Sequence, residues 1–431
     1  MRNKDDIEAI LREALYNASA PQTQAEYVFR KSLATRIGEN AITQNMGGEE
    51  EYLRIFVAHD KRQGSSITNK LEEKSIGTMI KRAEEIAENS PHNPEYMPPI
   101  KAQTYPEVPQ RYYEEVAQIR PADVAKEIHK TVEIAKIENY RASGLFEASC
   151  AIKAIANSEG LFAFDMHSSV DYSTTIHGPL GSGFCSRDGE SMKYVNTEAV
   201  TREALETAKE AQNPDPVDPG EYTVIFEPQA VYDFLGFLFW NMSARDADEG
   251  TTVFAGKVGQ KLLSDKVNIM TRIDDPELPA PPFGLDGLPA RPRLWVKKGV
   301  IMRLRHDRFW AGQKGTDPDP LLYPLFMEGQ DQSISDLIAT CKKGLLAKRL
   351  WYIRYVDRKE LLLTGMTRDG LFLIKDGKVV APVKNLRFNE SPVVFLQNIV
   401  AMSRPQRVEG SVKVPGIMSK NFTFSSKTES I

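Results

Sequence analysis

Two proline-rich stretches limit how this chain can fold. They read ENSPHNPEYMPPIKAQTYPEVP, from Glu88 to Pro109, and NPDPVDPGEY, from Asn213 to Tyr222. Proline lacks a backbone N–H and its ring clashes with the preceding helical turn, so neither stretch can continue a helix. We therefore expect three units, residues 1–100, 101–220 and 221–431. A chain of 431 residues is also longer than one hydrophobic core usually serves.

The first two units mix helical and strand patterns. The first opens with a helical pattern around Asp5 to Tyr16, continues with β-favouring runs and closes with a second helical pattern. In the second, Pro121 suits the first turn of a helix. The segments SGLFEASCAIKAIANSEG and LFAFDMHSSVDYSTTIHG then alternate roughly between apolar and polar residues, which is typical of a half-buried antiparallel sheet. We expect an N-terminal α/β unit and a middle unit of helices with an antiparallel sheet.

The third unit begins with a short strand and then a strongly apolar helix, from about Pro228 to Ala244. The helix is apolar almost all round, which predicts that it is largely buried; the apolar residues are Val231, Phe234, Leu235, Phe237, Leu238, Phe239, Trp240 and Met242. Strand-like pieces follow beyond Lys266, without the regular β-α-β alternation of parallel sheets. The sequence therefore predicts an α+β fold whose C-terminal domain is rich in β-structure.

The composition argues against several classes of protein. A net charge of -4 gives no basic field for binding nucleic acid. The longest apolar run, AVYDFLGFLFWNM, is shorter than the roughly 20 residues that a membrane span needs, and the first residues do not resemble a signal peptide. Three widely spaced cysteines suit a reducing compartment. We expect a cytoplasmic protein that contacts neither nucleic acid nor membrane.

The common catalytic motifs are missing from the sequence. There is no P-loop and no G-x-S-x-G elbow, and no two of the six His are close enough for one helix to present both to a zinc ion. The acidic cluster of Asp246, Asp248 and Glu249 could bind a hard cation, but a solvated charged turn explains it better. We expect no cofactor and no metal in this chain.

The segment KRLWYIRYVD, Lys348 to Asp357, interleaves basic and aromatic residues. Strict alternation would place Tyr352 and Arg354 on one side of a strand and Trp351 on the other. Aromatic and Arg side chains can grip a peptide without reading much of its sequence. Trp351, Tyr352 and Arg354 are therefore candidates for lining a substrate chamber; the alternative is that the two aromatic residues pack in the core or at an interface.

Several long runs resemble the TldD/PmbA family. In the third unit they are EGTTVFAGKVGQKLLSDKVNIMTRIDDPEL, FGLDGLPARP, MTRDGLFLIKDGKVVAPVKNLRFNESP and VPGIMSKNFTF. Shorter pieces, SSITNKLEEKSI, KRAEEIAENSP and IANSEGLFAFD, are similar to the family's first and middle domains. The resemblance covers nearly the whole chain in the family's order.

The resemblance implies a position for the family's zinc site. In the zinc-bearing TldD branch, a helix carries H-E-x-x-x-H before a run like Phe254 to Lys257 of this chain. Counting back without a gap places Leu235, Gly236 and Trp240 at those three positions. None of these side chains can bind zinc or move a proton. The chain is therefore similar to the PmbA (TldE) branch.

Members of that branch resemble non-catalytic partners in a peptidase complex. The resemblance implies a TldD-like zinc-bearing partner, unfolded or modified peptides as substrates, and zinc only in the partner. The alternative is a stand-alone homodimer that binds peptides without cleaving them. The phrase "modulator of DNA gyrase", used for some relatives, names a phenotype and does not imply contact with DNA.

Overall fold

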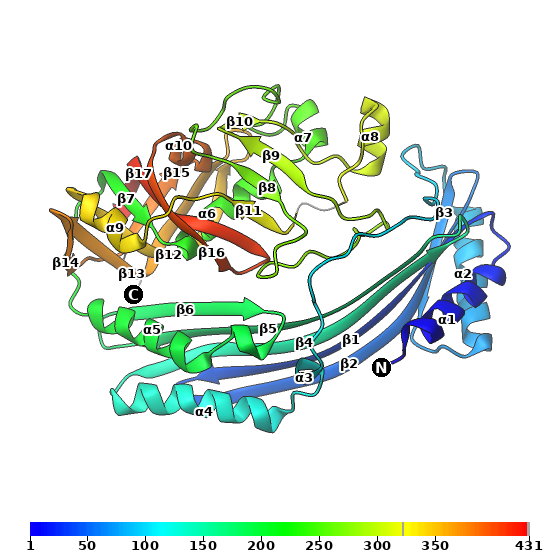
Figure 1. Cartoon of the computed structure of the whole chain (residues 1–431), viewed down its shortest axis with the longest axis horizontal. Coiled ribbons are helices and arrows are strands. Elements are labelled where there is room, and N and C mark those ends of the chain that lie inside the picture. Colours follow the sequence, from blue (N-terminus) through cyan, green and yellow to red (C-terminus); the bar gives the residue numbers. More distant parts are fainter. Residues whose placement is uncertain (321–322, 429–431) are drawn as a thin grey trace.

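A computed structural model describes residues 1–320 and 323–428 of the chain. Figure 1 shows two β-sheets, one above the other, with helices at the outer side of the lower sheet and around the upper one. The six-stranded lower sheet belongs to the N-terminal half and the eleven-stranded upper sheet to the C-terminal half. The predicted α+β class with a β-rich C-terminal domain is confirmed.

The N-terminal sheet joins strands from the first two predicted units. β1 pairs with β4 along the segment from Gln24 opposite Asn157 to Ile37 opposite Gly144, and the full order is β3-β2-β1-β4-β5-β6. Residues 1–100 and 101–220 thus share one sheet; the three-unit division itself stays a prediction. The strands are β1 (Gln22–Gly38), β2 (Ala41–His59), β3 (Arg62–Thr68), β4 (Arg141–Asn157), β5 (Phe162–His177) and β6 (Ser182–Gly189).

Helices cover only one face of this sheet. Residues at alternate positions of β4, such as Phe146, Cys150 and Ile152, pack under the helices in two hydrophobic clusters. The helices that supply these clusters lie along one side of the sheet in Figure 1. The helices of this half are α1 (Lys4–Tyr16), α2 (Glu73–Asn89), α3 (Glu114–Ala117), α4 (Pro121–Ile137), the 3₁₀ turn η1 (Met192–Tyr194) and α5 (Thr197–Glu210).

The opposite face of the sheet is polar. Residues directly opposite each other in an antiparallel pair point to the same side, and the register of β4 and β5 places Lys153 opposite Asp165 and Ser149 opposite Ser169. The two serine hydroxyls lie 3.0 Å apart. Because this face turns toward the C-terminal domain (Figure 1), the two halves of the molecule meet across polar side chains.

The first proline-rich stretch crosses between the halves as an extended strap. Between α2 and α3 it forms no helix or strand. The Tyr105 hydroxyl donates to the carbonyl of Gly287 at 2.9 Å, and the backbone of Arg111 accepts a hydrogen bond from Ser168 N at 2.9 Å. The strap therefore ties the N-terminal sheet to the C-terminal domain.

The C-terminal sheet closes on itself. β7 pairs with β12 on one side and with β17 on the other, and β17-β15-β13-β12 completes a ring of paired strands. The strands are β7 (Gly220–Phe226), β8 (Ile269–Thr271), β9 (Arg293–Lys297), β10 (Val300–Ile301), β11 (Leu325–Met327), β12 (Lys343–Asp357), β13 (Leu362–Lys375), β14 (Lys378–Pro382), β15 (Leu386–Glu390), β16 (Ile399–Val408) and β17 (Val412–Lys427). The helices are α6 (Pro228–Trp240), α7 (Ala244–Asp248), α8 (Arg308–Lys314), α9 (Ile334–Thr340) and α10 (Pro392–Gln397).

Helix α6 packs its apolar side against this ring. Pro228 occupies the first turn, where its missing N–H costs no hydrogen bond. The Phe234 ring lies 5.6 Å from the Phe388 ring and 5.8 Å from the Phe422 ring, both edge-on. The prediction that this helix is largely buried is confirmed for Leu235, Leu238 and Phe239. It is wrong for Trp240, which is 61% exposed. Among the described residues, no helix is both long and apolar enough to cross a membrane.

We expect Leu238→Ala to lower the free energy of unfolding by about 2–5 kcal/mol, because Leu238 is 1% exposed inside the aromatic core. Trp240→Ala, on the same helix, serves as the control. Its exposed ring lies 5.1 Å from the Phe237 ring, and because most of the side chain is exposed, its loss should cost about 1 kcal/mol or less. Urea unfolding of both variants measures the difference, and equal costs would contradict this packing of α6.

A buried carboxyl group on α6 gives a second prediction. Asp233 accepts hydrogen bonds from Leu350 N and from the Gln229 side chain, both at 3.0 Å. Burial raises the pKa of Asp233 to about 7, against the lowering effect of these hydrogen bonds and of Arg349, while Glu409 raises it further. Between about pH 4 and pH 7 the folded chain therefore holds a proton that the unfolded chain releases. The stability that this proton confers is complete at the acid end and is lost as the pH rises.

In Asp233→Asn the group cannot titrate, and the amide oxygen can still accept from Leu350 N. We expect the decline in unfolding free energy between pH 4 and pH 7 to be shallower in the variant, by up to about 1.4 kcal/mol per pH unit. Denaturant unfolding at several pH values measures both slopes. Parallel curves for the two proteins would show that Asp233 is ionised throughout this range.

Candidate functional site

A cavity of about 630 Å³ opens between the polar face of the N-terminal sheet and the C-terminal domain. The sheet contributes β4 and β5, and the strap contributes Arg111. The C-terminal domain contributes the end of α6 and loop residues at 279–285, 305, 320 and 323–324. The lining residues that matter for its chemistry are Arg111, Lys153, Asp165, His167, Trp240 and Arg305.

On the sheet side, the Asp165 carboxylate is held between Arg111 and His167. Arg111 Nη1 donates to Asp165 Oδ2, and His167 Nδ1 lies 3.3 Å from the same oxygen. Burial alone would raise the pKa of Asp165, but His167 and the Arg111 guanidinium together hold it below its ordinary value. Asp165 is therefore ionised at neutral pH, and it orients both neighbours at the cavity wall.

On the opposite side, Arg305 is fixed by its backbone while its side chain is exposed. Arg305 N donates to the carbonyl of Met242 at 2.8 Å, and its carbonyl accepts from Ala244 N at 2.9 Å. These bonds join the loop at residue 305 to the segment that follows α6. Within residues 1–320 and 323–428, the guanidinium of Arg305 forms no ion pair.

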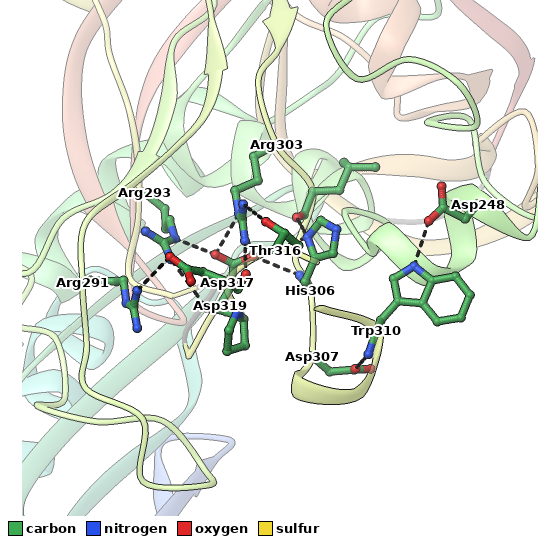
Figure 2. Close-up of polar contacts among 12 residues, drawn as sticks. Asp248, Arg291, Arg293, Arg303, His306, Asp307, Trp310, Thr316, Asp317 and Asp319 are labelled. Atoms are coloured by element: carbon green, nitrogen blue, oxygen red, sulfur yellow. Dashed lines mark hydrogen bonds and ion pairs between the residues drawn. The ribbon is translucent and has the colours of Figure 1, made fainter. Parts of the chain in front are cut away.

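The loop that carries Arg305 is anchored by a buried carboxylate, Asp319. Figure 2 shows Arg293 and Arg303 converging on it. Arg293 Nε lies 2.5 Å from Oδ1, Arg303 Nε lies 2.9 Å from Oδ2, and His306 N donates to Oδ2 at 3.0 Å. The carboxylate is fully buried. These contacts fix the backbone from residue 303 to Pro320, which lines the cavity.

We expect Asp319→Ala to lower the free energy of unfolding by about 3–5 kcal/mol, because two partly buried guanidinium groups lose their counter-charge. Asp317→Ala is the matched control two residues away. The Asp317 carboxylate is 77% exposed and lies 3.6 Å from Arg291, so its loss should cost less than about 1 kcal/mol. Thermal and urea unfolding compare the two variants; a mild effect at Asp319 would contradict its anchoring role.

The structure places the three positions of the implied zinc motif on α6, in two different environments. Leu235 and Gly236 are buried in the helix, whereas the Trp240 indole lines the cavity. An alkyl chain, a hydrogen atom and an indole N–H offer no lone pair to a cation, so these residues do not fit zinc. Across the described part of the chain, no three His, Cys, Asp or Glu residues are grouped so that they could hold a metal ion.

The acidic cluster after α6 has protein partners. The Asp248 carboxylate accepts from Trp310 Nε1 at 2.8 Å (Figure 2) and lies 3.0 Å from Lys314 Nζ. Glu249 pairs with Arg245 at 3.0 Å, and Arg245 also pairs with Glu95 of the strap. These contacts join α7 to α8 and to the strap.

The strand segment that carries Trp351, Tyr352 and Arg354 departs from simple alternation. Pairing of β12 with β13 shifts register between Trp351 and Arg354, and Tyr352 has a positive φ of 55°. Leu350 and Ile353, three positions apart, are therefore both buried, while Trp351, Tyr352 and Arg354 are all exposed. The two aromatic residues do not belong to the hydrophobic core of this chain. Their role in a substrate chamber stays a prediction.

An aromatic path connects this surface to the cavity. The Phe237 ring lies 5.1 Å from the Trp240 ring and 5.1 Å from the Tyr355 ring. The Tyr355 hydroxyl accepts a hydrogen bond from Asn241 Nδ2 at 2.9 Å. Trp351, Tyr352 and Arg354 do not line the cavity themselves, but they lie on the same strand as Tyr355.

Sequence reasoning did not find Arg111, Lys153 or Arg305. Lys153 and His167 face the cavity because of the pairing register of β4 and β5, and Arg111 reaches it because the strap returns to Ser168. Arg305 is an exposed loop residue. The alternation of LFAFDMHSSVDYSTTIHG was the available signal for Asp165 and His167, since it places both on one polar face.

Comparison with known proteins finds a family match in the C-terminal half and curated relatives over part of the chain. Residues 219–426 match the family described as "PmbA/TldA metallopeptidase C-terminal domain". A "Metalloprotease" of Methanothermobacter thermautotrophicus is 23% identical over 245 residues, which cover 51% of each chain. A "Metalloprotease TldD homolog" of Buchnera aphidicola is 21% identical over 193 residues, 40% of this chain and 38% of the relative. The chain thus spans about half or less of the length of these curated relatives.

Solved structures resemble nearly the whole chain. TldE from Thermococcus kodakarensis has a TM-score of 0.88 at 19% identity, covering 97% of this chain and 99% of that one. A putative modulator of a DNA gyrase from Thermotoga maritima has a TM-score of 0.89 at 15% identity, covering 97% and 100%. A putative modulator of DNA gyrase from Bacteroides thetaiotaomicron has a TM-score of 0.84 at 19% identity, covering 99% and 100%. These likenesses show a shared fold.

Proposed function

Because this chain belongs to the TldD/PmbA metallopeptidase family, we propose that it is a non-catalytic subunit that binds peptide beside a zinc-bearing, TldD-like partner. The observation that carries the proposal is the occupancy of the three motif positions. Leu235 and Gly236 are buried in α6 and Trp240 faces the cavity. A peptide bond at this place would meet an indole ring instead of a metal-bound water.

The cavity retains features that suit an extended peptide. It is large enough for a few residues, and it offers aromatic surface on one side and polar side chains on the other. Small-molecule and peptide sites combine these two properties, since apolar contacts give affinity and a few polar groups fix orientation. The polar face of β4 and β5 leads into the cavity from the N-terminal sheet.

The exposed segment of β12 extends this surface. Only residues Leu345–Ala347 of β12 pair with β7, so the part that follows lies at the edge of the sheet. Arg354 stacks on the Tyr352 ring at 4.5 Å and Arg349 on the Trp351 ring at 4.6 Å. We include Trp351, Tyr352 and Arg354 in the proposed peptide-binding surface, linked to Trp240 through Tyr355 and Phe237.

The test is to purify the chain alone, purify its nearest zinc-bearing relative alone, and assay both and their mixture on an unstructured peptide. We expect no cleavage and less than about 0.1 zinc per chain for the first sample, and faster cleavage by the mixture than by the relative alone. Trp240→Ala should raise KM in the mixture while lowering the melting temperature by no more than about 4 °C. Tyr16→Ala, an exposed aromatic residue on α1, is the control that should change neither.

Two results would decide against this proposal. A relative that cleaves at the same rate with or without this chain, and does not co-elute with it, would remove the role of subunit. A stable homodimer that binds the peptide and leaves it intact would instead support the alternative function, a stand-alone peptide-binding protein.

A further inference from the structure

The cavity holds more positive than negative charge. Its described lining residues include three cationic side chains, Arg111, Lys153 and Arg305, and one carboxylate, Asp165. In a cavity with low-dielectric walls such an excess attracts anions. The whole chain has a net charge of -4, so the excess of positive charge in the cavity is opposite in sign to the charge of the chain.

Two of the three cations already have a protein partner. Arg111 is paired with Asp165, and Lys153 Nζ lies 3.3 Å from the Glu26 carboxylate, which is itself largely buried. Arg305 is different, because no carboxylate in the described part of the chain lies within ion-pair distance of it. Its guanidinium is the charge that a ligand could use without breaking an existing pair.

A hydrogen-bond donor of Arg111 without a protein partner supports the same conclusion. Arg111 Nε is buried and forms no hydrogen bond with the described residues. Leaving a buried donor unsatisfied costs free energy, so buried polar atoms normally have a partner. Arg111 lines the cavity, where an anionic ligand with acceptor oxygens could reduce this cost.

The uncharged part of the lining is aromatic and proline-rich. Trp240, Phe239, Phe283 and Tyr323 contribute rings, and Pro279 and Pro281 contribute a rigid apolar edge. A ligand that fits this combination has an apolar group next to an anionic one. The end of a peptide, with an apolar last residue and a free carboxylate, meets both requirements.

We propose that this cavity binds the carboxylate of a peptide, with Arg305 as its charge partner and the Trp240 side of the cavity holding the adjacent apolar side chain. The inference rests on the proposed function, because it takes peptide as the ligand. It adds that the chain selects peptides by a carboxylate group. A guanidinium suits this role, since its planar fork can donate two parallel hydrogen bonds to one carboxylate.

The probes are three fluorescent, N-acetylated hexapeptides ending in Phe. The first has a free C-terminal carboxylate and no acidic side chain, the second is its C-terminal amide, and the third is an amide with one internal Glu. Fluorescence anisotropy with the purified chain gives a Kd for each at low and at moderate salt. We expect the free acid to bind about tenfold or more tightly than the simple amide, with the difference shrinking as salt is added.

Variants assign the effect to one side chain. Arg305→Ala should bring the free acid to the affinity of the amide, and Arg305→Lys should restore part of the preference. Arg404→Ala is the matched control, because Arg404 is an exposed arginine on β16 that pairs with Asp331 outside the cavity. Melting temperatures confirm that each variant is folded, which is expected since the Arg305 side chain is exposed and its backbone bonds do not depend on it.

The outcomes separate this inference from the function on which it rests. Equal binding of the acid and both amides would overturn the carboxylate preference and leave peptide binding in place. No binding of any probe would overturn peptide binding by the isolated chain as well. Tight binding of the Glu-containing amide would support the carboxylate site and identify an acidic side chain as its source. A preference for the free acid that survives in Arg305→Ala would overturn the assignment to Arg305.

Discussion

The packing of Phe234 against the closed ring of strands determines where most of the C-terminal domain lies. Its ring contacts aromatic side chains from β7, β15, β17 and α10. Each such pair adds about 0.5–1.5 kcal/mol beyond the burial of its area. These contacts hold α6 against the ring of strands and so fix the direction of the helix. Its last turn therefore lies at the boundary between the two halves of the molecule. The position of Trp240 in the cavity wall follows from that direction.

The same constraint places the three implied motif positions on α6 in different environments. The residues that hold α6 in place, such as Phe234 and Leu238, are separate from those that the resemblance assigns to zinc. Leu235 adds to the apolar packing of α6, whereas Gly236 is buried without a side chain. Trp240 differs because it is exposed and lines the cavity, so it contributes to the surface that a ligand meets more than to the packing of the core.

Much of the secondary structure could be predicted from the sequence, because local patterns determine it. Pro228 and the apolar residues of α6 predicted a buried helix, and the alternation in β4 and β5 predicted an antiparallel pair. The path of β12 was harder to predict from the sequence, because the positive φ at Tyr352 depends on tertiary contacts and not on the local pattern. The cavity could not be predicted, because it combines Lys153, Arg111 and Arg305 from segments more than 40 residues apart in the chain. Only the pairing of strands and the path of the strap bring them together.

The ring of strands also has a consequence for the order in which the protein forms during synthesis. β1 to β6 are complete once residue 189 has been made, and their strand pairings lie within that stretch. The C-terminal ring is different, because β7 (Gly220–Phe226) pairs with β17 (Val412–Lys427), almost 200 residues later. Pairings of such separation form slowly. While the ribosome makes the intervening residues, the apolar face of α6 stays exposed, because the later strands that cover it have not been made. An exposed apolar face of this kind is prone to aggregation. Chaperone binding during translation would therefore be concentrated on the nascent C-terminal half.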